Sequence, residues 1–184
     1  MLTPGHLASS YVISQVPSFW GKPLTKKEVF LVIIMGYILD LDLLVAKFFG
    51  IEKTYHHLLP THTPLFAVFL FVVVFIFLRR HFAPSALLLG GVALFSHLVL
   101  DDIGYWFYKL GLQEESSIPQ IFWLYPFDPR RGEAIAAIFQ ERAASEAVRL
   151  YLTKAPVNVA LETIFVILAL LLYFSSSKIR DRTT

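Results

Sequence analysis

The chain of 184 residues contains no cysteine, and only 16% of its residues are charged. Without cysteine there is neither a disulfide framework nor a thiolate ligand, so imidazole and carboxylate groups must hold any bound metal. The net charge is only +2 and no face rich in lysine or arginine is apparent, which argues against nucleic acid as a partner. No basic residue precedes the first weakly apolar stretch, which His6 interrupts, so we do not expect a signal peptide.

Apolar residues make up 56% of the chain and include 17 Phe, a larger share than in an ordinary soluble domain. A bilayer core ~30 Å thick is crossed by roughly 20 helical residues, and somewhat shorter runs are tolerated. Four apolar segments meet this requirement, at about 29–49, 64–78, 84–103 and 157–174. We therefore expect a single all-α domain, an integral membrane bundle of four transmembrane helices.

Two further segments are expected to be helical without crossing the membrane. Residues 4–16 are too few to span, but they can pack as half of a hairpin against the first long helix. In 111–155 the composition becomes that of a soluble segment, with the aromatic loop IFWLYPFDPRRG followed by EAIAAIFQERAASEAVRLYL. The second part has apolar residues at helical spacing with charges between them, which predicts an amphipathic helix on the bundle or the membrane interface.

The basic residues of the short loops predict an orientation, because lysine and arginine in such loops favour the cytoplasmic side. The opposite short loop carries only Lys47 and Lys53. We expect a multi-pass protein of the plasma (inner) membrane in which eight basic residues face the cytoplasm: Lys22, Lys26, Lys27, Arg79, Arg80, Lys178, Arg180 and Arg182. An aromatic belt is expected on the other side, formed by Trp106, Tyr108, Trp123 and Tyr125.

Ionisable side chains recur at one depth of the predicted bundle. Counted along the chain, they lie 13–17 residues from the ends expected near the cytoplasm, and a helix rises ~1.5 Å per residue. Five helices therefore deliver them to one layer near the non-cytoplasmic face. The residues of this layer are His6, Asp40, Asp42, His62, His97, Asp101 and Glu162.

Two motifs of this layer lie inside apolar segments. In SHLVLDD, His97 and Asp101 are four residues apart, so both project from one helical face and can bracket one ion. The alternative is a buried hydrogen bond that only joins two helices, but ionisable groups inside a membrane are costly and usually functional. In ILDLDLL, Asp40 and Asp42 point to nearly opposite faces of a regular helix. One can be a ligand and the other a supporting or helix-end group, unless the helix is broken there; a solvated helix end is the other interpretation.

The stretch YHHLLPTHTP gathers three histidines before an apolar run. Thr63 is a suitable N-cap and Pro64 a suitable first helical residue, so His62 lies just ahead of the positive end of a helix dipole. A helix N-terminus next to a metal suits an anionic phosphate group. His57 lies five residues earlier in the same loop, where histidines, His56 included, can equally be polar residues of the membrane interface.

Neutral imidazoles and carboxylates suit Zn²⁺, or Mn²⁺ where oxygen ligands dominate. One or two such ions would lower the pKa of a bound water towards ~7 and clamp a phosphoryl oxygen. Because a site at the outer lip of a bundle can take a headgroup from the leaflet, we expect a metal-bound hydroxide to hydrolyse a phosphoester in a lipid or lipid-linked substrate. Asp40 and His57 are candidates for proton transfer or for binding a second ion. Glu162 is either a residue that supports the ligands, a general base, or an interfacial carboxylate. The predicted metal ligands are His6, Asp42, His62, His97 and Asp101.

Two other classes of function also use His and Asp within a membrane. A metal-ion or proton transporter needs polar groups at several depths, and 65–78 and 164–174 offer no charged group. A non-enzymatic membrane scaffold needs no convergent layer, and stoichiometric metal in the purified protein would distinguish it from an enzyme. The sequence does not indicate the oligomeric state.

Five short motifs occur in a characteristic order: the Gly-His of Gly5 and His6, the DLD of Asp40 and Asp42, the HLLPTHT that contains His57 and His62, the HLVLD of His97 and Asp101, and WLYPF at 123–127. Together they resemble the bacterial and archaeal membrane-bound, metal-dependent hydrolases of the YdjM/YbcI type. Members usually have His-Arg-Gly before Thr-His-Ser, whereas here Leu58 and Leu59 follow His57, and Thr63 replaces the serine. The resemblance implies a hydrolase, distantly similar to zinc-dependent phospholipases C, in which a His and an Asp four residues apart help to build a metal cluster.

The absence of native cysteine makes the predicted orientation directly testable. Single cysteines in place of Lys26 and Arg180 should be shielded from an impermeant thiol reagent in intact cells, because basic loops are expected in the cytoplasm. A cysteine in place of Glu115 should be labelled, and all three should react after permeabilisation. The reverse pattern in intact cells would place the ionisable layer near the cytoplasmic face.

Overall fold

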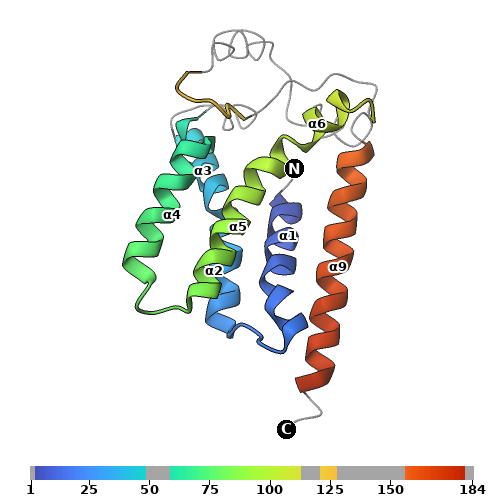
Figure 1. The fold of residues 1–184 in the computed structure, drawn as a ribbon. Helices are drawn as coiled ribbons and strands as arrows, with labels where there is room; N and C mark the ends of the chain where they lie inside the picture. Colours follow the sequence, from blue (N-terminus) through green and yellow to red (C-terminus); the bar gives the residue numbers. More distant parts are fainter. Residues whose placement is uncertain (1–2, 49–58, 113–120, 128–155, 181–184) are drawn as a thin grey trace.

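A computed structural model describes residues 3–48, 59–112, 121–127 and 156–180 of the chain. These residues form helices and connecting turns, and they contain no strand. The fold class is therefore all-α, as expected (Figure 1). The α-helices are α1 (Thr3–Gln15), α2 (Lys26–Tyr37), α3 (Asp42–Phe48), α4 (Pro64–Leu78), α5 (Pro84–Asp101), α6 (Ile103–Lys109) and α9 (Pro156–Arg180).

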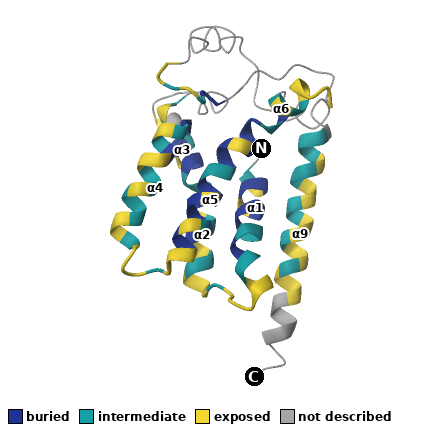
Figure 2. Cartoon of the chain, viewed as in Figure 1, coloured by how far each residue is buried: buried dark blue, intermediate teal, exposed yellow. Residues whose placement is uncertain are grey.

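The central helix of the bundle is α5, which packs against α1, α2 and α4. Its buried face joins Leu31, Met35 and Leu39 in one apolar core. By contrast, α4 and α9 have almost no fully buried apolar side chain and expose many of them, as the yellow and teal colouring of these helices shows in Figure 2. Soluble proteins rarely expose so much contiguous apolar surface, so the outer faces of α4 and α9 are suited to lipid tails.

The N-terminal helix is confirmed, because α1 occupies nearly the expected residues 4–16. Of the four expected spans, only two are helices long and apolar enough to cross a membrane, α5 and the part of α9 from Val157 to Ser175. The expected span 64–78 coincides with α4, but at 15 residues α4 is shorter than such a span. The predicted amphipathic helix, 133–152, lies outside the described residues; of the wider segment 111–155, residues 111–112 and 121–127 are described.

The expected first span, 29–49, is not one continuous helix. After α2 the chain forms a 3₁₀ turn at Ile38–Leu41 and then begins the short helix α3. In a regular α-helix two residues two positions apart point ~160° away from each other, whereas a 3₁₀ turn rotates by ~120° per residue and reduces this angle to ~120°. With the helix broken in this way, both aspartates are buried, and Asp40 lies near His97 while Asp42 contacts His62.

The two ends of the bundle differ in chemistry. At one end, the Glu28 carboxylate at the start of α2 accepts a hydrogen bond from Ala83 N (3.2 Å), so the connections α1–α2 and α4–α5 lie together there. Figure 1 shows the C-terminal end of α9 at this same end of the molecule. The basic residues of these segments therefore lie at one end, while α3, α6 and the C-terminal end of α5 lie at the other (Figure 1).

Small residues let α1 and α2 approach closely. The contact face of α1 consists of buried small side chains, among them Ala8, Ser9 and Ser10. Gly36 of α2 faces them: a Cβ added there would overlap Ser10 Oγ and lie 2.9 Å from Ser10 Cβ. The Ser10 hydroxyl donates a hydrogen bond to the His6 carbonyl (2.7 Å), so it cannot turn away without losing that bond.

We predict that Gly36→Ala destabilises the protein by about 1–3 kcal/mol, the usual cost of overpacking a well-packed contact. Thermal unfolding of the detergent-solubilised protein would measure the change. Adding Ser10→Gly removes the overlapping atoms and should recover part of the loss. A fully stable Gly36→Ala protein would show that α1 and α2 are not in the close contact described.

Candidate metal centre

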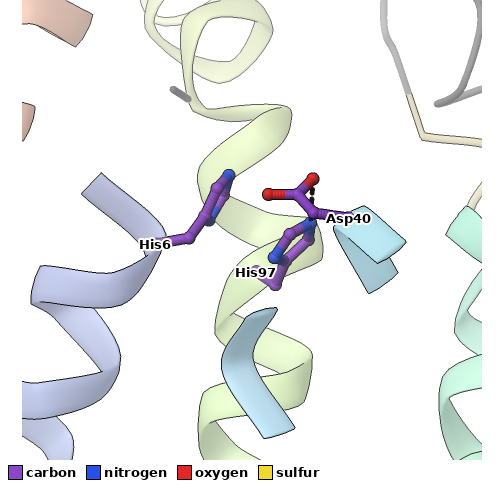
Figure 3. Close-up of side chains that lie close together, drawn as sticks. All are labelled: His6, Asp40 and His97. Atoms are coloured by element: carbon purple, nitrogen blue, oxygen red, sulfur yellow. Dashed lines mark ion pairs between the residues drawn. The ribbon is translucent and has the colours of Figure 1, made fainter. Parts of the chain in front are cut away.

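Five ionisable side chains from four elements meet near one end of the bundle and are buried there. His6 comes from α1, Asp40 from the 3₁₀ turn after α2, and His62 from a 3₁₀ turn at Pro60–His62. The last turns of α5 supply His97 and Asp101. Figure 3 shows three of them, His6, Asp40 and His97, pointing toward one another from separate elements. The five side chains are those of His6, Asp40, His62, His97 and Asp101.

His97 lies in the middle of this group. Its Nε2 is 3.1 Å from Asp101 Oδ2 and 3.6 Å from Asp40 Oδ1. The ring stacks on His6, with centroids 3.9 Å apart, and the centroid of His62 lies 5.4 Å away. Asp101 also accepts a hydrogen bond from His6 Nε2 (2.9 Å), so its carboxylate joins the two stacked rings.

The tautomer of His97 follows from its backbone contact. Its Nδ1 lies 2.8 Å from the carbonyl oxygen of Gly36, which can only accept, so Nδ1 carries the proton. In the neutral ring, Nε2 would then carry a lone pair that points toward two carboxylates. Nε2 is buried and makes no hydrogen bond with any described residue, although Asp101 Oδ2 lies 3.1 Å away. A cation between these atoms would satisfy all of them, as in a metal-bound histidine fixed by a backbone carbonyl.

His62 is oriented in a similar way by Asp42. Its Nδ1 lies 2.7 Å from Asp42 Oδ2, which also accepts a hydrogen bond from the hydroxyl of Thr61. The carboxylate fixes the proton on Nδ1, so Nε2 is the acceptor nitrogen of a neutral ring, and it lies 4.0 Å from Asp40 Oδ1. The two aspartates therefore differ: Asp40 belongs to the group of five, whereas Asp42 lies outside it and contacts His62.

A carboxylate outside the group, that of Glu162, connects α9 to α1. Glu162 of α9 accepts a hydrogen bond from Gly5 N (3.1 Å), an amide of the first turn of α1, where no intrahelical partner exists. Glu162 thus contacts the residue next to His6, which fits a supporting role among the interpretations left open by the sequence.

Asp102 is the residue that sequence reasoning missed. Its buried carboxylate accepts hydrogen bonds from Ile121 N (3.2 Å) and from the indole Nε1 of Trp123 (2.7 Å). Ile121 in turn packs into the apolar core beside Leu39. The aromatic segment 121–127 is therefore fastened at the end of α5, one residue after Asp101. The second aspartate of SHLVLDD, with WLYPF later in the chain, was the available signal.

The geometry of the group fits a divalent ion. Ligand atoms ~2.1 Å from one ion are ~3.0 Å apart at a right angle and ~3.4 Å apart at the tetrahedral angle. The separations around His97 Nε2, 3.1 and 3.6 Å, are of this size. Two triads have ligand atoms within 4.8 Å of one another and could hold a metal: His6, Asp40 and His97, and His62, His97 and Asp101. Both triads need His97, whose single lone pair on Nε2 can bind only one ion, so they describe one centre.

The outcome for the predicted site residues is uneven. The structure brings together His6, His62, His97 and Asp101, four of the five predicted ligands. The fifth, Asp42, contacts His62, whereas Asp40, predicted for proton transfer, lies in a triad. His57 lies outside the described residues. The roles of all these residues remain predictions.

Residues 1–180 match the family described as YdjM inner membrane protein, which is nearly the whole chain. The chain belongs to the YdjM inner membrane protein family. Neither the curated proteins nor the solved structures gave a match. Membership supports the membrane location expected from composition and from the apolar outer faces of α4 and α9.

We predict that Asp42→Ala lowers the affinity for a divalent metal by about 10- to 100-fold, the usual effect of removing the partner that orients a ligating histidine. Asp42→Asn should lower the metal affinity less, because its amide oxygen can still accept a hydrogen bond from His62 Nδ1. Competition with a chromogenic chelator would measure both affinities. If Asp42 is itself a ligand, Asn should be nearly as damaging as Ala, since a neutral amide does not offset the charge of the ion.

Proposed function

We propose that this protein is a membrane-embedded, metal-dependent hydrolase of a phosphoester in a lipid or lipid-linked substrate. The observation that carries the proposal is the buried Nε2 of His97, which lies 3.1 and 3.6 Å from carboxylate oxygens of two separate elements and makes no hydrogen bond with a described residue. Such an arrangement costs free energy unless a cation joins the groups. Zn²⁺ is the proposed ion, with Mn²⁺ as the alternative.

The proposed ligands are the members of the two triads, with Asp40 in place of Asp42. A bound divalent ion would lower the pKa of a water ligand and draw charge from a phosphoryl oxygen. The chain itself keeps the ligand nitrogens in position through the Gly36 carbonyl and the Asp42 carboxylate. In this proposal Asp40, whose Oδ1 lies 3.6 Å from His97 Nε2 and 4.0 Å from His62 Nε2, would also accept the proton of the attacking water.

Three features of the surroundings favour a phosphate-bearing lipid over a soluble substrate. The group lies toward one end of the bundle, between helices whose outer faces are apolar. The N-terminus of α4 begins directly after His62, and a helix N-terminus attracts anions. The buried residues Ile121 and Phe122, fastened through Asp102, shield this end of the bundle from water. A lipid headgroup could reach the centre from the leaflet without leaving the membrane.

Metal analysis of the detergent-purified protein, combined with hydrolysis of a panel of phospholipids and soluble phosphodiesters, tests the proposal. The expected result is one divalent ion per chain and turnover that a chelator abolishes and Zn²⁺ or Mn²⁺ restores. Stoichiometric metal without turnover of any phosphoester would contradict the hydrolase and favour a transporter. Absence of metal after reconstitution would contradict both and favour a scaffold.

Asp101 separates a metal ligand from a structural hydrogen bond. If it binds the ion, Asp101→Asn should lose both metal and hydrolysis, because a neutral amide is a poor ligand. If it only joins the two stacked histidines, Asp101→Asn should keep most of the contact and be nearly silent. His81→Ala is the matched control, since this exposed histidine lies at the opposite end of the bundle. Unchanged helicity by circular dichroism would exclude unfolding as the cause, and an active, metal-loaded Asp101→Asn protein would refute the assignment.

A further inference from the structure

A second feature of the molecule lies at the basic end of the bundle, away from the metal centre. A cavity of about 760 Å³ opens between α1, α2 and α9, within the range of small-molecule sites. The segment that joins α1 to α2 forms its outer rim. None of its lining residues belongs to the metal centre or to the elements 60–62 and 121–127.

The lining of this cavity is divided into a polar and an apolar part. Ser18 and Lys26 lie at the rim, where the chain turns from α1 into α2. Val29, Phe30 and Ile33 continue from the rim along one face of α2. From residue 26 to residue 33 a helix rises ~10 Å, which matches the glycerol and first acyl carbons of a lipid. The division suits an amphiphile whose polar part stays at the end of the bundle.

The charge at this rim is positive. Lys22, Lys26 and Lys27 lie in or beside the turn, and all three are exposed. The one acidic residue of the same turn, Glu28, does not line the cavity, because its carboxylate accepts hydrogen bonds from Thr25 and from Ala83 N. A lysine at the first position of a helix is unfavourable for the helix dipole. Helix stability therefore does not explain Lys26, whereas an anionic ligand does.

Two large aromatic side chains mark this rim as the membrane surface. Phe19 and Trp20 are 71% and 73% exposed, and they directly precede the turn at Gly21. Exposed aromatic residues of this kind lie at the headgroup level of a bilayer. Lys26 is thus at the depth of lipid phosphates and Ile33 at the depth of acyl chains.

We propose that this cavity is a binding site for an anionic phospholipid of the leaflet at the basic end of the bundle. Lys26 pairs with the phosphate and the exposed headgroup, and one acyl chain lies along Val29, Phe30 and Ile33. The site binds lipid without reacting with it, and it does not depend on the proposed hydrolase.

The test is lipid binding to the full chain in detergent, with phosphatidylglycerol as the anionic probe and phosphatidylcholine as the zwitterionic one. Native mass spectrometry counts the lipids retained per chain. We expect Lys26→Gln to reduce retained phosphatidylglycerol several-fold at low salt and to leave phosphatidylcholine unchanged. Lys27→Gln is the matched control, because this neighbour has the same charge and exposure but does not line the cavity.

A second pair of variants tests the apolar part. Ile33→Trp should fill the cavity and reduce retention of both lipids, whereas Ile34→Trp, on the adjacent exposed position outside the cavity, should not. Unchanged thermal unfolding and helicity would show that the fold is intact. Equal losses in Lys26→Gln and Lys27→Gln would overturn the proposal, since the attraction would then come from general surface charge. Lipid retention that stays unchanged in both Lys26→Gln and Ile33→Trp would overturn the proposal as well.

Discussion

The contact on which the candidate centre depends is the hydrogen bond from His97 Nδ1 to the carbonyl of Gly36. It joins the central helix α5 to α2, and it also decides which nitrogen of His97 faces the carboxylates. The bond is possible only because α2 lies close to both α1 and α5 at this point, and Gly36 is the residue that allows the approach. The Ser10 hydroxyl that fills the space beside Gly36 is bonded to the His6 carbonyl, so backbone packing and ligand placement are set by the same few atoms. A substitution at Gly36, which has no functional side chain, should therefore displace groups of the candidate metal centre.

The second constraint is the free energy of burying ionisable groups together. Asp40, Asp101 and three imidazoles are buried, and two of these groups, His97 and Asp101, lie in a helix suited to a membrane, where an unpaired charge is costly. The structure responds in two ways. The helix is broken after Tyr37, where neighbouring aspartates reach different partners, and His62 is paired with Asp42, whose carboxylate also accepts a hydrogen bond from Thr61. A broken helix within such a bundle is tolerated where its exposed backbone is covered by protein. The break is thus explained by the polar centre that it serves.

Much of this could be predicted from sequence because membrane burial makes ionisable residues conspicuous. The i, i+4 pair His97 and Asp101, the cap-and-proline start of α4 after His62, and the matched depth of His6 required only helical geometry. The division of work between Asp40 and Asp42 could not be predicted, since it depends on a 3₁₀ turn that local preferences do not specify. Gly36 gave no signal because its contribution is a backbone carbonyl, and Asp102 was overlooked because its partners, Ile121 and Trp123, lie about 20 residues along the chain in a segment without periodicity. For Trp123, expected in an aromatic belt, the composition gave no sign that its indole N–H donates to Asp102.

The two ends of the bundle are built for opposite electrostatic tasks. At one end, carboxylates and imidazoles are concentrated and buried, an arrangement that could hold a small divalent cation. At the other, lysines are exposed around an apolar cavity, an arrangement that selects an anion attached to a hydrocarbon chain. The helices α1 and α2 reach both ends. α1 carries His6 toward one end and Gln15 at the other. α2 begins with Lys26 at the basic end, and the 3₁₀ turn that follows it supplies Asp40. A lipid held against α1 and α2 at the basic end would stiffen the same two helices that position His6 and the Gly36 carbonyl. In these proposals, occupancy of the cavity and order in the candidate metal centre would be linked through the packing of α1 and α2, without any contact between the two ligands.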